Sequence, residues 1–400
     1  MNDITNNTNP ETFLCRSLER TDFDDIRFHS DVEVPEAMRH MLDNKQFINL
    51  LSTIFPLMPK DVLKQQLSSV TSIYDFQKRF VYPFLKNMEA TKTKGIDFWG
   101  IETIDANKSH LYISNHRDIT VDAAFLGLLM IENQKNTVAI GIGDNLLIHP
   151  WIENLVRINK SFIVKRGLNA RQALEASQKL SAYMRFLIKD AKQSIWIAQR
   201  EGRSKDSNDR TQEALLKMLF FSGEKSYCEN FSELNICPLT ISYEYDPTDY
   251  LKAKEFQLRR DNPEYKKAPQ DDLDNMEVGL MGYRGKVDYR VSGDVNNEIG
   301  RIVEKTTVVR ERIGLLAKAI DRKIHSNYTI FNVNKIAYDL LKQERRFTND
   351  YLDSERFDFE HYISKQIAKI EIENKDSIFL REKMLEMYAN QLINHLGEDI

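Results

Sequence analysis

The sequence predicts an α/β protein with a three-layer core, in which a mostly parallel central sheet is flanked by N-terminal and C-terminal helical segments. Three observations lead to this fold class. Apolar segments with strand character alternate with amphipathic segments between residues 95 and 294, several strand candidates are apolar at nearly every position, and both flanks have helical periodicity. Continuous apolar strands are typical of a parallel sheet that helices cover on both faces.

Six segments are the candidate strands. They are residues 110–114, 137–142, 161–164, 194–199, 236–243 and 286–292. Amphipathic helices are expected between several of them, the clearest over 169–190. The charged, proline-containing segment 251–274 is expected to be an excursion before the last strand.

The same pattern divides the chain into three parts. Residues 1–94 are expected to be a helical region with loose first residues, broken into short helices by Pro56, Pro59 and Pro83. Residues 95–294 are expected to form the α/β domain, and residues 295–400 a C-terminal helical extension.

Composition narrows the function classes. The net charge is −4 without a basic stripe, so no nucleic-acid partner is expected. The three cysteines, Cys15, Cys228 and Cys237, lack metal-ligand spacing and cannot form a disulfide framework, which favours a reducing, cytoplasmic compartment. Neither a signal peptide nor an apolar run of about 18 residues is recognised, so a soluble or peripheral protein is expected.

The candidate catalytic residues follow the first of these strand candidates. His116 lies two residues after that strand, Asp118 two residues later, and Asp122 opens an apolar helical run. A neutral imidazole held by a carboxylate acts as a general base near pH 7. Since no Gly-x-Ser-x-Gly motif is present, a substrate hydroxyl is the expected nucleophile. Either aspartate could be the partner of the histidine.

Two other interpretations of this loop fail. His-Arg-Asp also opens the kinase catalytic loop, but that signature has an asparagine five residues after its aspartate, where this chain has Ala123. The remaining histidines lie in no recognised ligand spacing, so no metal is expected.

Four blocks, in order, resemble motifs of the phospholipid/glycerol acyltransferase superfamily, the glycerol-3-phosphate and 1-acylglycerol-3-phosphate O-acyltransferases. The segment SNHRDITVD is similar to the first motif, an Asn-His followed by an aspartate. The other three blocks are residues 143–167, 199–209 and 236–247. The resemblance covers about residues 95–294. Two departures stand out: the acids lie two and six residues after His116 rather than five, and the third block lacks its threonine.

The resemblance implies transfer of a fatty acyl group from acyl-CoA or acyl-ACP to the hydroxyl of glycerol 3-phosphate, without a metal or other cofactor. His116 would take the hydroxyl proton. Asp122 would orient the ring, because it opens the apolar helix as the family's aspartate does, and Asp118 is the competitor. Lysophosphatidate or another lipid is the alternative acceptor, and an inactive lipid-binding relative is the alternative class.

The second and third blocks are expected to bind the acceptor phosphate, since arginine suits phosphate geometry and both blocks follow strands at one sheet edge. The predicted substrate-binding residues of these two blocks are Lys165, Arg166, Glu201, Gly202, Arg203 and Ser204, and Arg117 of the first block is predicted with them. Lys160, Arg200 and Lys205 belong to the same clusters. The alternative is that these are solvated loop charges.

A membrane surface is the other expected partner, because the acyl product is insoluble, and an acyl carrier protein is a possible one. The candidate contact is the segment 47–67, where apolar residues precede Lys60 and Lys64. The alternative is that this segment packs on the α/β core. On this basis the protein is expected on the inner face of a membrane.

Overall fold

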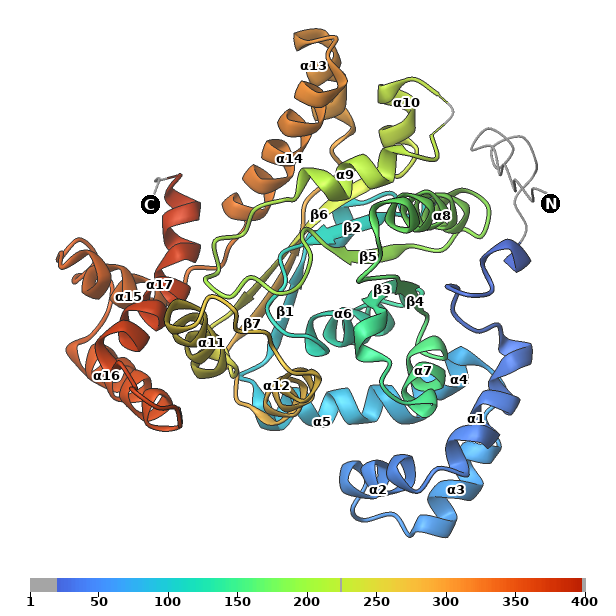
Figure 1. Ribbon diagram of the computed structural model, residues 1–400, viewed down its shortest axis with the longest axis horizontal. Helices are drawn as coiled ribbons and strands as arrows, with labels where there is room; N and C mark the ends of the chain where they lie inside the picture. The colour runs from blue at the N-terminus through green and yellow to red at the C-terminus, as the bar shows by residue number, and fades with distance from the viewer. Residues whose placement is uncertain (1–19, 224, 398–400) are drawn as a thin grey trace, which may run out of the picture.

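The computed structural model describes residues 20–223 and 225–397, and its centre is a seven-stranded sheet (Figure 1). The strand order is β1-β7-β6-β2-β5-β3-β4. The strands are β1 (Ile96–Trp99), β2 (Leu111–Ser114), β3 (Ala139–Gly143), β4 (Ser161–Val164), β5 (Ile195–Ala198), β6 (Ile236–Tyr243) and β7 (Val287–Val291). Cys15 and the first residues, expected to be loose, lie outside the described residues.

The sheet is mostly parallel, as predicted. Strand β2 pairs in parallel with β5 and β6, and β3 pairs in parallel with β4 and β5. Strand β7 runs antiparallel to β6, and β1 is parallel to β7. All six candidate strands are present. Strand β1 was missed because it has only four residues and none of them is buried.

Helices cover both faces of the sheet (Figure 1). Along β2, Leu111 and Ile113 belong to one hydrophobic cluster and Tyr112 to another, which is the alternation expected of a strand buried on both sides. Helices α5 (Tyr82–Lys92) and α6 (Val121–Glu132) pack on the Tyr112 face. The opposite face carries α8 (Ala170–Lys189), α9 (Glu213–Phe220), α13 (Asn296–Lys305) and α14 (Val309–Ser326).

The N-terminal helices pack into the same cluster as α8. They are α1 (Val34–Leu42), α2 (Lys45–Ile54), α3 (Lys60–Ser68) and α4 (Ile73–Phe76), and a π-helical turn (Gln77–Val81) joins α4 to α5. The ring of Phe23 lies 4.9 Å from that of Tyr183 on α8. The connecting helices of the core are α7 (Pro150–Arg157) and α10 (Tyr227–Ser232).

The C-terminal helices form a third hydrophobic cluster, at the left of Figure 1 beside α11 (Asp249–Asp261). They are α15 (Asn332–Lys342), α16 (Asp353–Ala368) and α17 (Ser377–Leu396). Helices α16 and α17 pack against α11. The expected excursion before β7 consists of two helices, α11 and α12 (Pro269–Met281). Within the described part of the chain, no helix is long and apolar enough to cross a membrane.

Candidate active site

The loop between β2 and α6 holds His116 against Asp122. The imidazole Nδ1 lies 2.8 Å from Asp122 Oδ2. The loop leaves the sheet in a fixed direction because the side chain of Asn115 pairs with the backbone N–H and C=O of Ile241, both at 2.8 Å. Asn115 thereby extends the β2–β6 ladder by one side-chain rung and orients the residue that follows it.

Asp122 is fully buried at the N-terminus of α6. Its Oδ2 also accepts the backbone N–H groups of Arg117 at 2.6 Å and Asp118 at 3.1 Å, and its Oδ1 accepts the hydroxyl of Tyr243 at 2.6 Å. Burial is the largest influence on the pKa of Asp122 and acts to raise it, but His116 and the surrounding donors together hold that pKa below its ordinary value. The carboxylate is therefore a buried anion with a partner for each oxygen.

Asp118 has a different position. Its Oδ1 accepts the N–H groups of Thr120 at 3.0 Å and Val121 at 2.9 Å, as a helix cap does, and its Oδ2 pairs with the buried Arg284 at 3.1 Å. Of the two candidate carboxylates, the structure brings Asp122 to the imidazole and uses Asp118 to begin α6.

His116 lines a cavity of about 1170 Å³. Its ring meets Trp196 edge-on, with centroids 5.5 Å apart, and its Nε2 has no hydrogen-bond partner among the described residues. The apolar wall of the cavity is lined by residues of several helices, among them Leu51, Phe55, Phe80, Leu128, Ile131, Leu155, Leu180 and Met276. An unpartnered imidazole nitrogen is thus available next to an apolar space.

Five of the predicted substrate-binding residues line the same cavity, namely Lys165, Arg166, Glu201, Gly202 and Arg203. Arg166 forms an ion pair with Glu201, with Nη1 and Oε1 3.3 Å apart. The guanidinium of Arg203 donates to Thr248 at 3.3 Å and to Asn275 at 3.0 Å. Gly202 has a φ of +69°, a left-handed conformation that glycine adopts without strain.

Arg117 and Ser204 do not line the cavity, so direct substrate contact by either does not fit the structure. The side chain of Arg117 is 2% exposed and pairs with the buried Asp209 at 2.7 Å. Ser204 is buried, with its hydroxyl on Asp206 at 3.1 Å and its N–H on the carbonyl of His116 at 3.2 Å. Both instead tie the His116 loop to the segment that follows β5.

The other three basic residues divide in the same way. Arg200 and Lys205 line the cavity, and Lys205 pairs with Glu255. Lys160 does not: its ammonium donates to the carbonyl of Thr137 at 3.2 Å and to Gln193 at 3.1 Å. Burial lowers the pKa of Lys160 to about 8.

Several residues around the site carried no signal in the sequence. Tyr243 ends the last strand block, yet nothing in its spacing pointed to Asp122. Lys267 and Met276 line the cavity, and Asn275 contacts Arg203, only because the segment that contains α12 folds over this end of the sheet. In the described residues there is no group of three His, Cys, Asp or Glu side chains that could hold a metal ion.

Comparison with protein families decides the chemistry class. The family model described as Acyltransferase matches residues 95–241, which span β1 to most of β6 and contain the His116 loop. Residues 95–241 form an acyltransferase domain. The predicted family resemblance and the prediction of an acyltransferase are therefore confirmed for this part of the chain.

Two other comparisons with known proteins add little to this finding. The crystal structure of the 1-acyl-sn-glycerophosphate (LPA) acyltransferase, PlsC, from Thermotoga maritima is similar over 73% of this chain and 95% of that chain. Its sequence identity is 11% and its TM-score is 0.33, too distant a likeness to carry an argument about activity. A search of curated proteins found no match.

Proposed function

We propose that the protein transfers a fatty acyl group from an acyl thioester to the hydroxyl of glycerol 3-phosphate, as a step of phospholipid biosynthesis. One observation carries the proposal: the His116–Asp122 pair opens on a large apolar cavity whose polar end holds Arg166 and Arg203. An apolar space suits an acyl chain, and guanidinium groups suit a phosphate.

In the proposed reaction His116 Nε2 takes the proton of the acceptor hydroxyl as its oxygen attacks the thioester carbonyl. The new C–O bond forms, the C–S bond breaks, and the imidazolium returns its proton to the departing thiolate. Asp122 keeps Nδ1 protonated and stabilises the imidazolium that forms in between. No metal or other cofactor takes part in this scheme.

The acyl chain of the donor is proposed to occupy the apolar part of the cavity. Its volume of about 1170 Å³ is larger than that of typical small-molecule sites, which reach about 1,000 Å³. The acceptor phosphate would bind at the charged end, where Arg166 and Arg203 come from loops after β4 and β5. Both strands end at the same edge of the sheet as β2.

Thioester consumption tests the acceptor and the donor. The purified protein is given acyl-CoA or acyl-ACP with glycerol 3-phosphate, and then with lysophosphatidate, each with and without a chelator. We expect turnover with glycerol 3-phosphate that the chelator leaves unchanged. Turnover with lysophosphatidate but not with glycerol 3-phosphate would show that lysophosphatidate is the acceptor. Loss of turnover in the presence of the chelator would contradict the mechanism. The absence of turnover with every combination of donor and acceptor would contradict the proposed activity.

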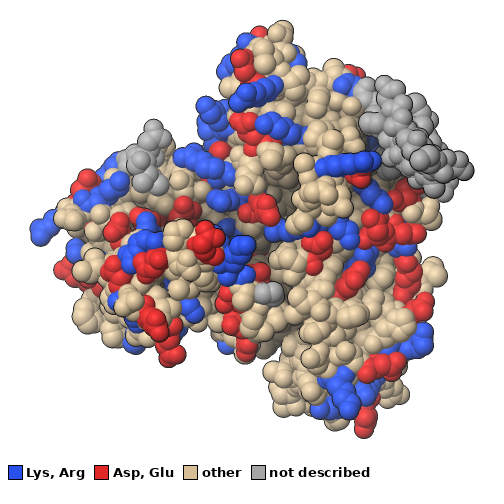
Figure 2. Space-filling view, in the orientation of Figure 1, with Lys and Arg blue, Asp and Glu red and all other residues tan. Residues whose placement is uncertain are grey.

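We also propose that the protein works at the inner face of a membrane, with α2, α3 and the turn between them as the contact. Phe47, Ile48 and Leu51 are buried in the core, so only part of the predicted segment is available. Leu57 is 99% exposed and Val62 41% exposed, and Figure 2 shows a region with few charged side chains over α2. Elsewhere on that face, acidic and basic side chains are mixed.

Vesicle sedimentation tests this contact. Leu57→Glu combined with Val62→Glu should lower the fraction that sediments with anionic vesicles, because carboxylates replace apolar groups that would enter the interface. Phe357→Glu, at an exposed apolar residue of α16, is the matched control. Unchanged sedimentation of the folded double variant would exclude this surface as the contact.

A further inference from the structure

Lys252, on α11, is a buried cation that lies against the loop carrying His116. Its side chain is 1% exposed, and its ammonium pairs with the carboxylate of Asp246. Nζ also donates to the carbonyl oxygen of Arg117 at 2.9 Å. Burying an ammonium group costs several kcal/mol of desolvation unless it is paired and hydrogen-bonded. Lys252 lies outside the residues that match the family model and does not line the cavity.

The carbonyl that Lys252 holds belongs to the peptide group between Arg117 and Asp118. In a trans peptide the C=O and the N–H lie in one plane and point in opposite directions. The N–H of that group, on Asp118, donates to Asp122 Oδ2 at 3.1 Å. The same oxygen lies 2.8 Å from His116 Nδ1. Lys252 therefore fixes the plane of a peptide group that orients the carboxylate partner of the histidine.

The ammonium also polarises this peptide group. A cation on the carbonyl oxygen strengthens the N–H of the same group as a donor, because successive hydrogen bonds in a buried chain reinforce one another. Asp246 keeps the arrangement electrically balanced. Burial is the largest influence on the pKa of Asp246 and raises it, but Lys252 and the two donors of Thr248 together hold that pKa below its ordinary value.

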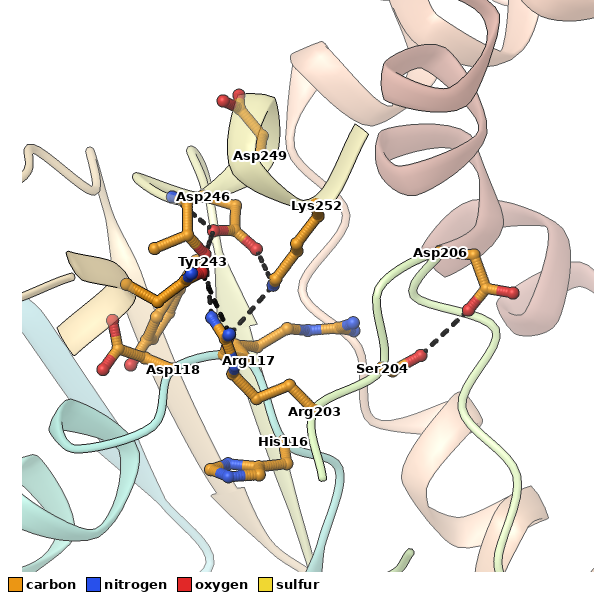
Figure 3. Close-up of polar contacts among 12 residues, drawn as sticks. His116, Arg117, Asp118, Arg203, Ser204, Asp206, Tyr243, Asp246, Asp249 and Lys252 are labelled. Atoms are coloured by element: carbon orange, nitrogen blue, oxygen red, sulfur yellow. Dashed lines mark hydrogen bonds and ion pairs between the residues drawn. The ribbon is translucent and has the colours of Figure 1, made fainter. Parts of the chain in front are cut away.

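The C-terminal helices hold this group of residues in turn. The N–H of Asp246 donates to the hydroxyl of Tyr388 on α17 at 3.1 Å. Asp249, at the start of α11, accepts the hydroxyls of Tyr388 at 2.8 Å and of Tyr362 on α16 at 2.6 Å. Figure 3 shows Asp246, Lys252 and the backbone of Arg117 joined in one line that runs toward His116.

We propose that Lys252 is a positioning residue for the His116–Asp122 pair, and that α16 and α17 act on acyl transfer through it. Its kinetic consequence rests on the proposed function, whereas its effect on the hydrogen bond between His116 and Asp122 does not. The C-terminal helices thereby become part of the working enzyme although they do not line the cavity and lie outside the matched domain.

Kinetics of Lys252→Met test the proposal, since methionine keeps most of the apolar stem and removes the ammonium. We expect kcat to fall roughly 10- to 100-fold, the effect of a reacting group displaced by about 1 Å. The KM values of donor and acceptor should stay within about twofold, because the cavity is untouched. Lys335→Met is the matched control: it removes an ion pair with Asp350 at 2.8 Å in the same C-terminal region, without contact to the loop, and should leave kcat unchanged.

Two further variants distinguish a loss of positioning from a loss of the folded structure. Lys252→Met with Asp246→Asn removes both charges and leaves no unpaired carboxylate, and it should show the same loss of kcat. Tyr388→Phe removes one hydroxyl and should lower kcat severalfold, a smaller fall than that of Lys252→Met. Equal kcat of the wild type and the folded double variant would overturn the proposal.

Proton NMR gives a readout that does not depend on turnover. The proton on His116 Nδ1, hydrogen-bonded to a carboxylate, should resonate far downfield and be absent in His116→Ala. We expect the double variant to shift this signal upfield or broaden it, and Lys335→Met to leave it unchanged. An unchanged signal in the double variant would contradict the positioning role. If the wild type transfers no acyl group, the proposed function fails while this measurement still decides the role of Lys252.

Discussion

The two sides of the His116 ring are built differently. On the cavity side the neighbours are apolar groups and charges that water reaches, such as Arg166 at 34% and Glu201 at 69% exposure. On the Nδ1 side, Asp122, Tyr243 and Tyr289 are buried and hydrogen-bonded to one another, with the Tyr289 hydroxyl on the carbonyl of Asp122 at 2.9 Å.

This contrast separates two tasks. Groups on the cavity side can exchange water for substrate, so changes there should act on substrate binding. Groups on the buried side have their partners already, so changes there should act on kcat and on stability.

The largest effect is expected at the ring that joins the two sides. His116→Ala should lower kcat by roughly 10²- to 10⁴-fold, the usual contribution of a general base, while the fold is kept because the ring is partly exposed to the cavity. Steady-state kinetics with a circular-dichroism check of folding measure this. Wild-type turnover in a folded variant would show that His116 is not the base.

The next effect distinguishes the two carboxylates. Asp122→Asn should lower kcat more than Asp118→Asn, because it removes the anion that stabilises the imidazolium, whereas Asp118 caps α6 and pairs with Arg284. Asp118→Asn should instead cost mainly stability, about 1–3 kcal/mol for leaving Arg284 without its charged partner. Urea unfolding and kcat of both variants decide the order, and the reverse order for kcat would give the role to Asp118.

On the cavity side the predicted change is in binding. Arg166→Ala and Arg203→Ala should each raise the KM of the acceptor by one or two orders of magnitude, since a charge-assisted hydrogen bond contributes about 1.5–3 kcal/mol. Arg171→Ala, an exposed arginine on α8 paired with Glu175, is the control. Unchanged acceptor KM in both cavity variants would make these residues solvated charges.

The smallest effect is expected at Asp249, which does not line the cavity. Burial is the main cause that raises its pKa from 3.8 to about 6. The folded state thus binds this proton more tightly than the unfolded chain, so the stability it contributes is full below pH 3.8 and is lost as pH rises through 6. The free energy of unfolding of Asp249→Asn, taken relative to that of the wild type, should therefore be higher at about pH 7.5 than at about pH 5, by roughly 1–1.5 kcal/mol.

Urea unfolding at the two pH values measures this difference. Asp353→Asn, at an exposed carboxylate of α16, is the control and should show no comparable trend. A gain that is equal at both pH values would mean that Asp249 does not titrate in this range.

The sequence predicted contacts between residues that are close along the chain better than contacts between distant ones. His116 and Asp122 are six residues apart, so their pairing follows from one loop and one helix start. The strands were found because their apolar runs are local patterns, and β1 was missed because its four residues are partly exposed. The membership of Arg166 and Arg203 in one cavity followed from strand ends meeting at one sheet edge.

Contacts between residues far apart along the chain could not be predicted from the sequence. Arg117, directly after His116 in the block that resembles the family's first motif, was predicted to bind substrate. Its partner, Asp209, lies 92 residues further along the chain, and Lys252 is 135 residues away from the carbonyl it holds. Only the folded structure, which buries the Arg117 side chain against Asp209, shows that Arg117 serves the buried side.

His116 can present Nε2 as a proton acceptor only if Asp122 holds the proton on Nδ1. Nitrogen-15 NMR of the imidazole, assigned with His116→Ala, measures this tautomer directly at a pH where the ring is neutral. We expect a protonated Nδ1 and an unprotonated Nε2. A proton on Nε2 instead would contradict the proposed mechanism, because that nitrogen could not then take the proton of an acceptor hydroxyl.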